Sequence, residues 1–335
     1  MGPVDGFEIV LLTGFLGSGK TTLLKHFLAD QAAADLGVVV NEIGEVDVDG
    51  AVLAPSAGKV PLALLSNGCI CCAADGDLAG TVAMLQEERA RRGLRPLRRV
   101  IVETSGAARP GPVLRGLRLL GDRAKTACVS TFDARDWRRA LRTPEGRSQL
   151  GGASRIVVTK LDGLADGDRR AAEAAARAAN PLAQVIVADD APQRARGAFS
   201  APAGPPTTVA LPADLSGPAP PPMTTGVVRF PQALRYDELM EWLDNAAGLL
   251  GERLYRTKGF VRVRGAPDRL LVQGVGTTFA QPVRFPAPGR ESFIVLIGEQ
   301  LERAELEAVE PLVRRDIAVG RRTSALGRAL RETLA

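Results

Sequence analysis

Histidine is almost absent from this chain of 335 residues, in which the single one is His26. A metal site in this protein must therefore depend on cysteine and carboxylate side chains. Long apolar runs are also missing, and none approaches the roughly 20 residues that a membrane-spanning helix requires. The first eight residues lack the basic and apolar regions of a signal peptide, and Gly6 stands where a myristoylation signal carries serine or threonine. We therefore expect a cytoplasmic protein.

The net charge is also small, because the chain has 43 Lys and Arg residues and 38 Asp and Glu residues. Basic clusters such as Arg89–Arg99 lie beside acidic residues or at a predicted helix end, where cations suit the helix dipole. This pattern does not predict a surface that follows nucleic-acid phosphates, and we expect neither nucleic acid nor membrane among the partners. The length allows two domains.

Apolar, strand-like runs alternate with helical patterns over the first 190 residues. This order predicts an α/β domain with a doubly wound, mostly parallel sheet, whose ligands bind beyond the carboxyl ends of the strands. The predicted strands are Ile9–Thr13, Gly37–Glu42, Pro61–Ser66, Val100–Thr104, Ala127–Phe132, Arg155–Thr159 and Gln184–Ala188. The predicted helices are Thr21–Ala33, Gly76–Arg92, Pro112–Leu120, Ala134–Leu141 and Gly167–Ala179.

Composition changes after this domain. Residues 191–225 are rich in Pro, Ala and Gly and predict a linker, since Pro lacks an N–H and Gly is costly to order. Residues 226–335 predict a smaller α+β domain and tail. Its predicted elements are strands at Gly226–Arg229, Gly259–Arg264, Leu270–Val275 and Ser292–Ile297, helices at Tyr236–Leu249 and from about Leu301, and an Arg-rich helix or frayed tail over Arg314–Ala335.

The most informative segment is a glycine-rich loop between the first strand and the first helix, which matches the phosphate-binding pattern G-x-x-x-x-G-K-[ST]. Its glycines let consecutive backbone N–H groups point at phosphate oxygens, and the helix N-terminus adds positive charge. Lys20 would reach the β- and γ-phosphates, and the Thr21 hydroxyl would bind Mg²⁺. The residues that we expect to bind nucleotide here are Gly14, Gly17, Ser18, Gly19, Lys20, Thr21 and Thr22.

An acidic residue ends the strand Arg99-Val-Ile-Val-Glu103. Glu103 would hold Mg²⁺ directly or through water, and the N–H of Gly106 would sense the γ-phosphate, so that this segment acts as a switch. The alternative is an ordinary strand end with a solvated glutamate. We predict Lys20, Thr21 and Glu103 as the catalytic residues.

The segment Thr159-Lys160-Leu-Asp162 resembles the base-reading pattern Asn-Lys-x-Asp of GTPases, with Thr in the first position. Asp162 would accept two hydrogen bonds from guanine, which adenine cannot donate, and Lys160 would lie along the base. A carboxylate left unpaired by the wrong base is costly, so this segment predicts GTP in preference to ATP.

Three of the four cysteines are crowded into Asn67-Gly-Cys69-Ile-Cys71-Cys72. Thiolates in such a cluster suit Zn²⁺ or another soft or borderline metal, whereas disulfides are not expected in the cytoplasm. The alternative is a set of small buried residues in a tight turn. Cys128 stands alone within a predicted strand and is expected in the core.

Together, four motifs resemble the CobW family of P-loop GTPases, which are cytoplasmic metallochaperones. They are Gly14–Thr22, Asn41–Val46, Asn67–Cys72 and Glu103–Gly106, and the later strand Lys258–Arg262 resembles the C-terminal domain of that family. The resemblance implies a GTP hydrolase that binds a divalent metal, Zn²⁺ or alternatively Co²⁺, and delivers it to a client protein.

By position, the resemblance makes Cys69, Cys71 and Cys72 the metal thiolates, with Glu42 or Glu45 as an oxygen ligand. In the alternative, one of these two glutamates, which lie in the first switch region, would bind Mg²⁺ or its water and not the transferred metal. This chain lacks the histidine-rich stretch of many members and has Val40 where several have glutamate. The alternatives are a GTP-gated maturation or regulatory factor for one enzyme, or cobalt delivery in cobalamin synthesis.

Overall fold

The computed structural model describes six stretches of the chain, and the account below concerns these alone. They are residues 6–30, 35–41, 62–65, 78–199, 223–286 and 291–320. The chain divides into two compact units. The N-terminal unit comprises residues 1–176 and 183–200, and the C-terminal unit comprises residues 177–182 and 201–335.

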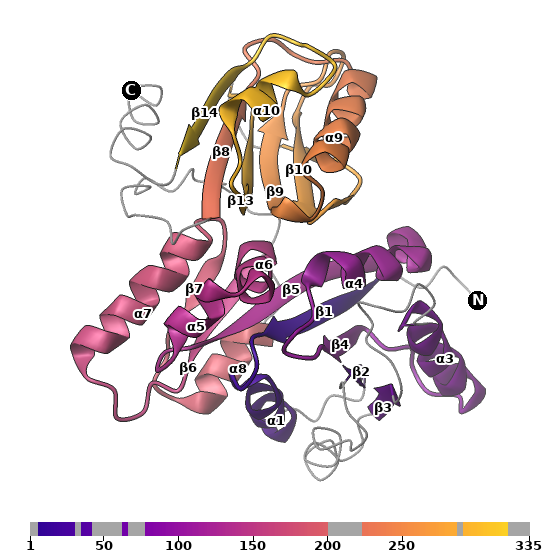
Figure 1. Ribbon diagram of the computed structural model, residues 1–335. Helices are drawn as coiled ribbons and strands as arrows, with labels where there is room; N and C mark the ends of the chain where they lie inside the picture. The colour runs from indigo at the N-terminus through magenta and orange to yellow at the C-terminus, as the bar shows by residue number, and fades with distance from the viewer. Residues whose placement is uncertain are drawn as a thin grey trace. The chain divides into compact units, whose positions relative to one another are not determined.

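The N-terminal unit is built on a seven-stranded sheet in the order β3-β2-β4-β1-β5-β6-β7, with every neighbouring pair parallel (Figure 1). Its central strands are apolar and buried, as expected when helices cover both faces. The predicted fold class is confirmed. The strands are β1 Phe7–Gly14, β2 Leu36–Asn41, β3 Leu62–Leu65, β4 Arg99–Glu103, β5 Ala124–Asp133, β6 Arg155–Thr159 and β7 Gln184–Ile186.

Helices connect these strands, and the five predicted ones are present with small shifts at their ends. Two further helices, α6 and α8, were not predicted. The helices are α1 Lys20–Asp30, α3 Leu78–Arg91, α4 Pro110–Leu117 with the 3₁₀ turn η1 Arg118–Arg123, α5 Trp137–Arg142, α6 Pro144–Gly152, α7 Asp166–Ala179 and α8 Ala191–Phe199.

Helix α8 occupies residues 191–199, where the sequence predicts the start of the linker, so that part of the prediction is wrong. Its apolar side chains Ala195, Ala198 and Phe199 are spaced three and four residues apart, and they join the core of the N-terminal unit. The ring of Phe199 packs against Phe27 of α1, with 4.6 Å between the ring centroids. Packing against the sheet thus stabilises a segment whose composition resembles a linker.

The C-terminal unit contains a second sheet, in the order β11-β10-β9-β13-β8-β14, with β12 also pairing with β10. Its strand pairs are antiparallel, unlike those of the first sheet. Helix α9 buries Trp242 in the core of this unit, edge-on to Phe230 with 5.5 Å between the ring centroids. The elements are β8 Met223–Arg229, α9 Tyr236–Leu250, the 3₁₀ turn η2 Gly251–Arg253, β9 Leu254–Val261, β10 Arg269–Val275, β11 Thr278–Phe279, β12 Val283–Phe285, β13 Phe293–Glu299, α10 Arg303–Ala308 and β14 Asp316–Gly320.

Strand β14 corrects the prediction of a helix or frayed tail from Arg314 onward. It pairs with β8, and its residue Ile317 is buried in the core of the C-terminal unit. The strand signal is the two-residue spacing of Ile317 and Val319, which the surrounding arginines obscure. The remaining part of the predicted tail, residues 321–335, lies outside the described residues.

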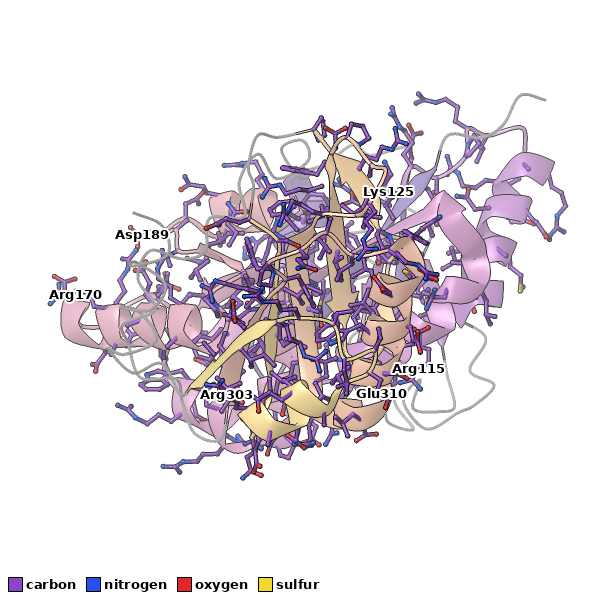
Figure 2. The ribbon with its side chains drawn as sticks, turned by 90° about the horizontal axis from the view of Figure 1, so that it is seen from above. Arg115, Lys125, Arg170, Asp189, Arg303 and Glu310 are labelled. Carbon is purple, nitrogen blue, oxygen red and sulfur yellow. The ribbon has the colours of Figure 1, made fainter. Side chains whose placement is uncertain are left out.

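Basic side chains are spread over separate elements of the fold. Figure 2 labels four exposed ones, Arg115 on α4, Lys125 on β5, Arg170 on α7 and Arg303 on α10. In the described part of the chain, no helix is both long and apolar enough to cross a membrane.

Candidate functional site

The glycine-rich loop joins the carboxyl end of β1 to the start of α1, at the centre of the sheet. Three of its glycines, Gly14, Gly17 and Gly19, have φ angles of 143°, 71° and 94°, which disfavour other residues. A Cβ atom on Gly14 would lie 2.2 Å from Oγ1 of Thr131. The loop therefore needs glycine both for its backbone conformation and for its close approach to β5. Thr22, in the first turn of α1, is exposed.

Buried hydroxyl groups of the adjacent strands β5 and β6 hold this loop in place. The hydroxyl of Ser18 lies 2.6 Å from that of Thr131 on β5, and the Thr131 hydroxyl also donates to the carbonyl of Thr13 at 3.4 Å. Thr159, at the end of β6, donates its hydroxyl to the carbonyl of Ser18 at 2.7 Å and to that of Phe132 at 3.2 Å. The loop is thus fastened to two neighbouring strands.

Sequence reasoning missed Thr131 as a residue of this site. The available signal was its place near the carboxyl end of a predicted strand, because in a parallel sheet these ends lie along one edge. Thr159 was predicted as a nucleotide-binding residue, in the first position of the base-reading pattern, and its hydroxyl holds the loop. This explains how threonine serves at a position where the base-reading pattern has asparagine.

Lys20 and Thr21 begin helix α1 and lie beside the loop. The Lys20 ammonium group donates to the carbonyl of Gly14 at 3.0 Å, so it crosses over the loop. The Thr21 hydroxyl donates to Oε1 of Glu103 at 2.7 Å. Glu103 ends β4 directly beside β1 and is only 1% exposed. A hydroxyl and a carboxylate oxygen that meet at a phosphate-binding loop form a donor set suited to Mg²⁺.

Gly106 follows Glu103 and contacts the loop from the other side. A Cβ atom on Gly106 would lie 2.7 Å from the backbone nitrogen of Leu16, so only glycine allows this approach. Gln149 of α6 donates to the carbonyls of Gly106 and Ala108 at 3.0 and 2.9 Å. Gln149 was not predicted, because α6 was not. The predicted switch segment is therefore in backbone contact with the phosphate loop and is held by a fully buried side chain.

Beyond Thr159, the predicted base-reading segment turns outward. Lys160 has a φ of 56°, a left-handed conformation that is uncommon for a residue other than glycine. Its ammonium group forms an ion pair with Asp133 at 2.6 Å. The carboxylate of Asp162 is exposed and accepts no hydrogen bond from any residue that the structure describes.

The five residues predicted for the transferred metal lie outside the described residues. They are Cys69, Cys71, Cys72, Glu42 and Glu45. Among the side chains that the structure does describe, no group of three or more His, Cys, Asp or Glu is arranged to hold a metal ion. Cys128 is buried in β5 with 2% exposure, which confirms its predicted place in the core.

Two protein-family models match this chain. The nucleotide-binding domain of the CobW/HypB/UreG family matches residues 8–187, and the C-terminal domain of the cobalamin synthesis protein CobW matches residues 223–309. The first match includes the phosphate loop, Glu103 and the Thr159–Asp162 segment.

Similar proteins extend over nearly the whole chain. The zinc chaperone YjiA of Escherichia coli is 29% identical over 333 residues, covering 91% of this chain and 98% of YjiA. The zinc chaperone CobW of Pseudomonas aeruginosa is 28% identical, covering 89% of each chain. The crystal structure of Zn(II)-bound YjiA GTPase from E. coli has the same fold, with a TM-score of 0.64 and 23% identity over 93% of this chain and 100% of that one. The protein therefore belongs to the CobW/HypB/UreG family.

Proposed function

We propose that this protein is a GTP-hydrolysing metallochaperone, which binds a divalent metal, in the first place Zn²⁺, and delivers it to a client protein. The observation that carries the proposal is the convergence of Lys20, Thr21 and Glu103 on one glycine loop, in a chain that also contains the cysteine cluster. Full-length similarity to proteins named zinc chaperones supports the choice of metal.

For hydrolysis, the loop would bind the phosphates through its backbone N–H groups and the N-terminus of α1. Lys20 would leave the Gly14 carbonyl and neutralise charge that develops between the β- and γ-phosphates. Thr21 and Glu103 would hold Mg²⁺, which when bound neutralises phosphate charge. Gly106 would detect the γ-phosphate, because its backbone already touches the loop at Leu16.

For the choice of nucleotide, the unpaired and exposed carboxylate of Asp162 would accept the two N–H groups on the guanine edge. Adenine offers no such pair, so a bound adenine would shield this carboxylate from water and give it no partners. GTP would therefore be preferred to ATP.

For the transferred metal, Cys69, Cys71 and Cys72 would supply thiolates, and Glu42 or Glu45 an oxygen. Strands β2 and β3 run parallel to β1 and end at Asn41 and Leu65, so the chain enters both segments from the edge that carries the phosphate loop. Free thiolates require a reducing compartment, which fits a cytoplasmic protein. Delivery of Co²⁺ is the narrower alternative.

The experiment is a Zn²⁺ titration against a competing chelator, with a non-hydrolysable GTP analogue, with GDP and without nucleotide. If GTP orders an oxygen ligand on the metal, it must tighten metal binding, and metal must tighten GTP binding by the same factor, with a coupling of roughly 1–3 kcal/mol. Affinity should also rise with pH as the thiols lose their protons.

The control is the variant Cys71→Ser/Cys72→Ser, which should lose the metal and keep GTP binding. Equal Zn²⁺ affinity in all three nucleotide states, or an undiminished affinity in the double variant, would contradict the chaperone. A GTP-gated regulatory factor with structural cysteines would then remain.

A further inference from the structure

A compact set of contacts joins the end of β5 to the segment that carries Asp162. Asp133, the last residue of β5, accepts the backbone N–H of Arg135 on Oδ1 at 2.9 Å and the Lys160 ammonium on Oδ2 at 2.6 Å. The guanidinium of Arg135 donates to the carbonyl of Lys160 at 3.4 Å and to that of Asp162 at 2.6 Å. Both oxygens of Asp133 and two sides of the Arg135 guanidinium are thus used.

These contacts act on backbone that would not keep its shape unaided. The left-handed φ of Lys160 is unfavourable by about 1 kcal/mol or more for a residue with a side chain, and it persists only where neighbours enforce it. Arg135 binds the carbonyl on each side of Leu161, so it spans the turn between Lys160 and Asp162. The Asp162 side chain takes no part in this network and remains exposed.

We propose that Arg135, whose backbone N–H Asp133 holds, is the positioning residue that fixes Asp162 for recognition of the guanine base. The proposal rests on the GTP preference proposed above and adds a second element to it. Arg135 contacts only the backbone of the segment, and therefore it acts through Asp162 and not on the nucleotide itself. Asp133 has a double role, because it holds the backbone N–H of Arg135 and the ammonium group of Lys160.

A positioning residue of this kind has a distinct kinetic signature. The phosphate loop, Lys20 and Glu103 do not contact Arg135, so the rate of the bound complex should not depend on it. Two acceptor hydrogen bonds to Asp162 require both oxygens in place, so a mobile turn weakens GTP binding. ATP makes no use of Asp162, and its affinity should stay the same.

The experiment compares the binding of GTP and ATP, and GTP turnover, for Arg135→Ala, Arg135→Lys and Asp162→Asn. We expect Arg135→Ala to raise the Kd and KM for GTP about tenfold, the size of one lost charged hydrogen bond, with kcat and ATP affinity unchanged. Arg135→Lys keeps one donor and should restore part of the loss. Arg138→Ala is the matched control, since its exposed guanidinium lies over the Trp137 ring and contacts no part of the segment.

The outcomes separate the two proposals. Equal affinity of the unchanged protein for GTP and ATP would overturn guanine recognition itself. If the protein prefers GTP and Asp162→Asn abolishes that preference, but Arg135→Ala retains it, only the positioning role fails. A parallel loss of GTP and ATP affinity in Arg135→Ala, or a lowered melting temperature that accounts for the change, would also overturn the positioning role.

Discussion

The two sheets of this protein place their buried polar groups differently. In the parallel sheet, four of them lie at or within two residues of the carboxyl ends of four strands, namely Thr13, Glu103, Thr131 and Thr159, all 7% exposed or less. In the antiparallel sheet, the buried Arg256 and Thr257 and the partly buried Lys258 lie in the middle of β9.

The difference follows from strand direction. Parallel neighbours bring equivalent ends to one edge, so their polar groups converge on a single ligand. Antiparallel neighbours alternate, so polar groups within their strands share no common edge, and the partly buried charge of Lys258 bears a cost of burial. Burial, and after it the positive charge of Arg256, lower the pKa of Lys258 from 10.5 to about 8. Polar groups gathered at strand ends therefore indicate a site in the first sheet, whereas the charge of Lys258 is expected to lower the stability of the second.

The strongest test of this comparison is Lys20→Ala. Loss of the ammonium that serves the β- and γ-phosphates should lower GTP turnover about 10³-fold, as for other groups that stabilise a transition state. The melting temperature should change little, although the hydrogen bond to the Gly14 carbonyl is lost. Lys25→Ala, on the exposed side of the same helix, should turn over GTP normally. Normal turnover in Lys20→Ala would mean that the loop is not the catalytic centre.

A second test exchanges the hydrogen-bonding pattern of Asp162. Asp162→Asn should lower GTP affinity about 10²-fold, because the amide donates where the carboxylate accepts, and xanthosine triphosphate should bind in its place. Competition binding with GTP, ATP and XTP measures both effects. A variant that keeps its GTP preference would place base recognition elsewhere.

A third test compares two glycines that are near each other in the sequence, one in contact with the phosphate loop and one in open space. Gly106→Ala should lower the free energy of unfolding by about 1–3 kcal/mol and weaken nucleotide binding, since the new Cβ atom overlaps the backbone of Leu16. Gly116→Ala, in α4 with open space around it, should raise that free energy by about 0.5–1 kcal/mol. Urea denaturation and nucleotide titration of both variants check this. If both variants have the same free energy of unfolding and the same nucleotide affinity, the contact between Gly106 and the loop is not needed for stability or binding.

The smallest expected effect concerns the antiparallel sheet. Because the folded state of Lys258 loses its proton near pH 8 and the unfolded state near pH 10.5, the free energy of unfolding should rise between these values. Lys258→Met should be more stable by about 1–2 kcal/mol at pH 7, and its stability should change less from pH 8 to 10.5.

Thermal denaturation across this pH range measures the difference between the two proteins. Lys125→Met, at an exposed position, should follow the unchanged protein. A Lys258→Met variant that is less stable than the unchanged protein would show that Lys258 stabilises the fold. A variant whose stability depends equally on pH would show that the pKa of Lys258 is not lowered.

Most strands were predictable because each is an apolar run with turn residues at its ends. Helix α6 was not, although Thr143 and Pro144 begin it and the Thr143 hydroxyl accepts the Gly146 N–H at 3.1 Å. Its three glycines disfavour a helix, but Gly146 packs so closely on α5 that a Cβ atom would lie 2.1 Å from the Ala140 carbonyl. At this position, packing against α5 requires a glycine, although glycine has a low intrinsic propensity for helices.

By itself, the sequence determined which residues we propose for the chemistry: the glycine loop with Lys20 and Thr21, the acid at Glu103 and the carboxylate at Asp162. Only the tertiary structure decided what holds them. Thr131 lies 113 residues from Ser18, and Gln149 lies 43 residues from Gly106. Such pairs meet because β1 lies between β4 and β5 and α6 packs beside them, and no short-range pattern encodes this order. A motif consists of residues that are close in the sequence, whereas the residues that hold it in place are close only in the folded structure.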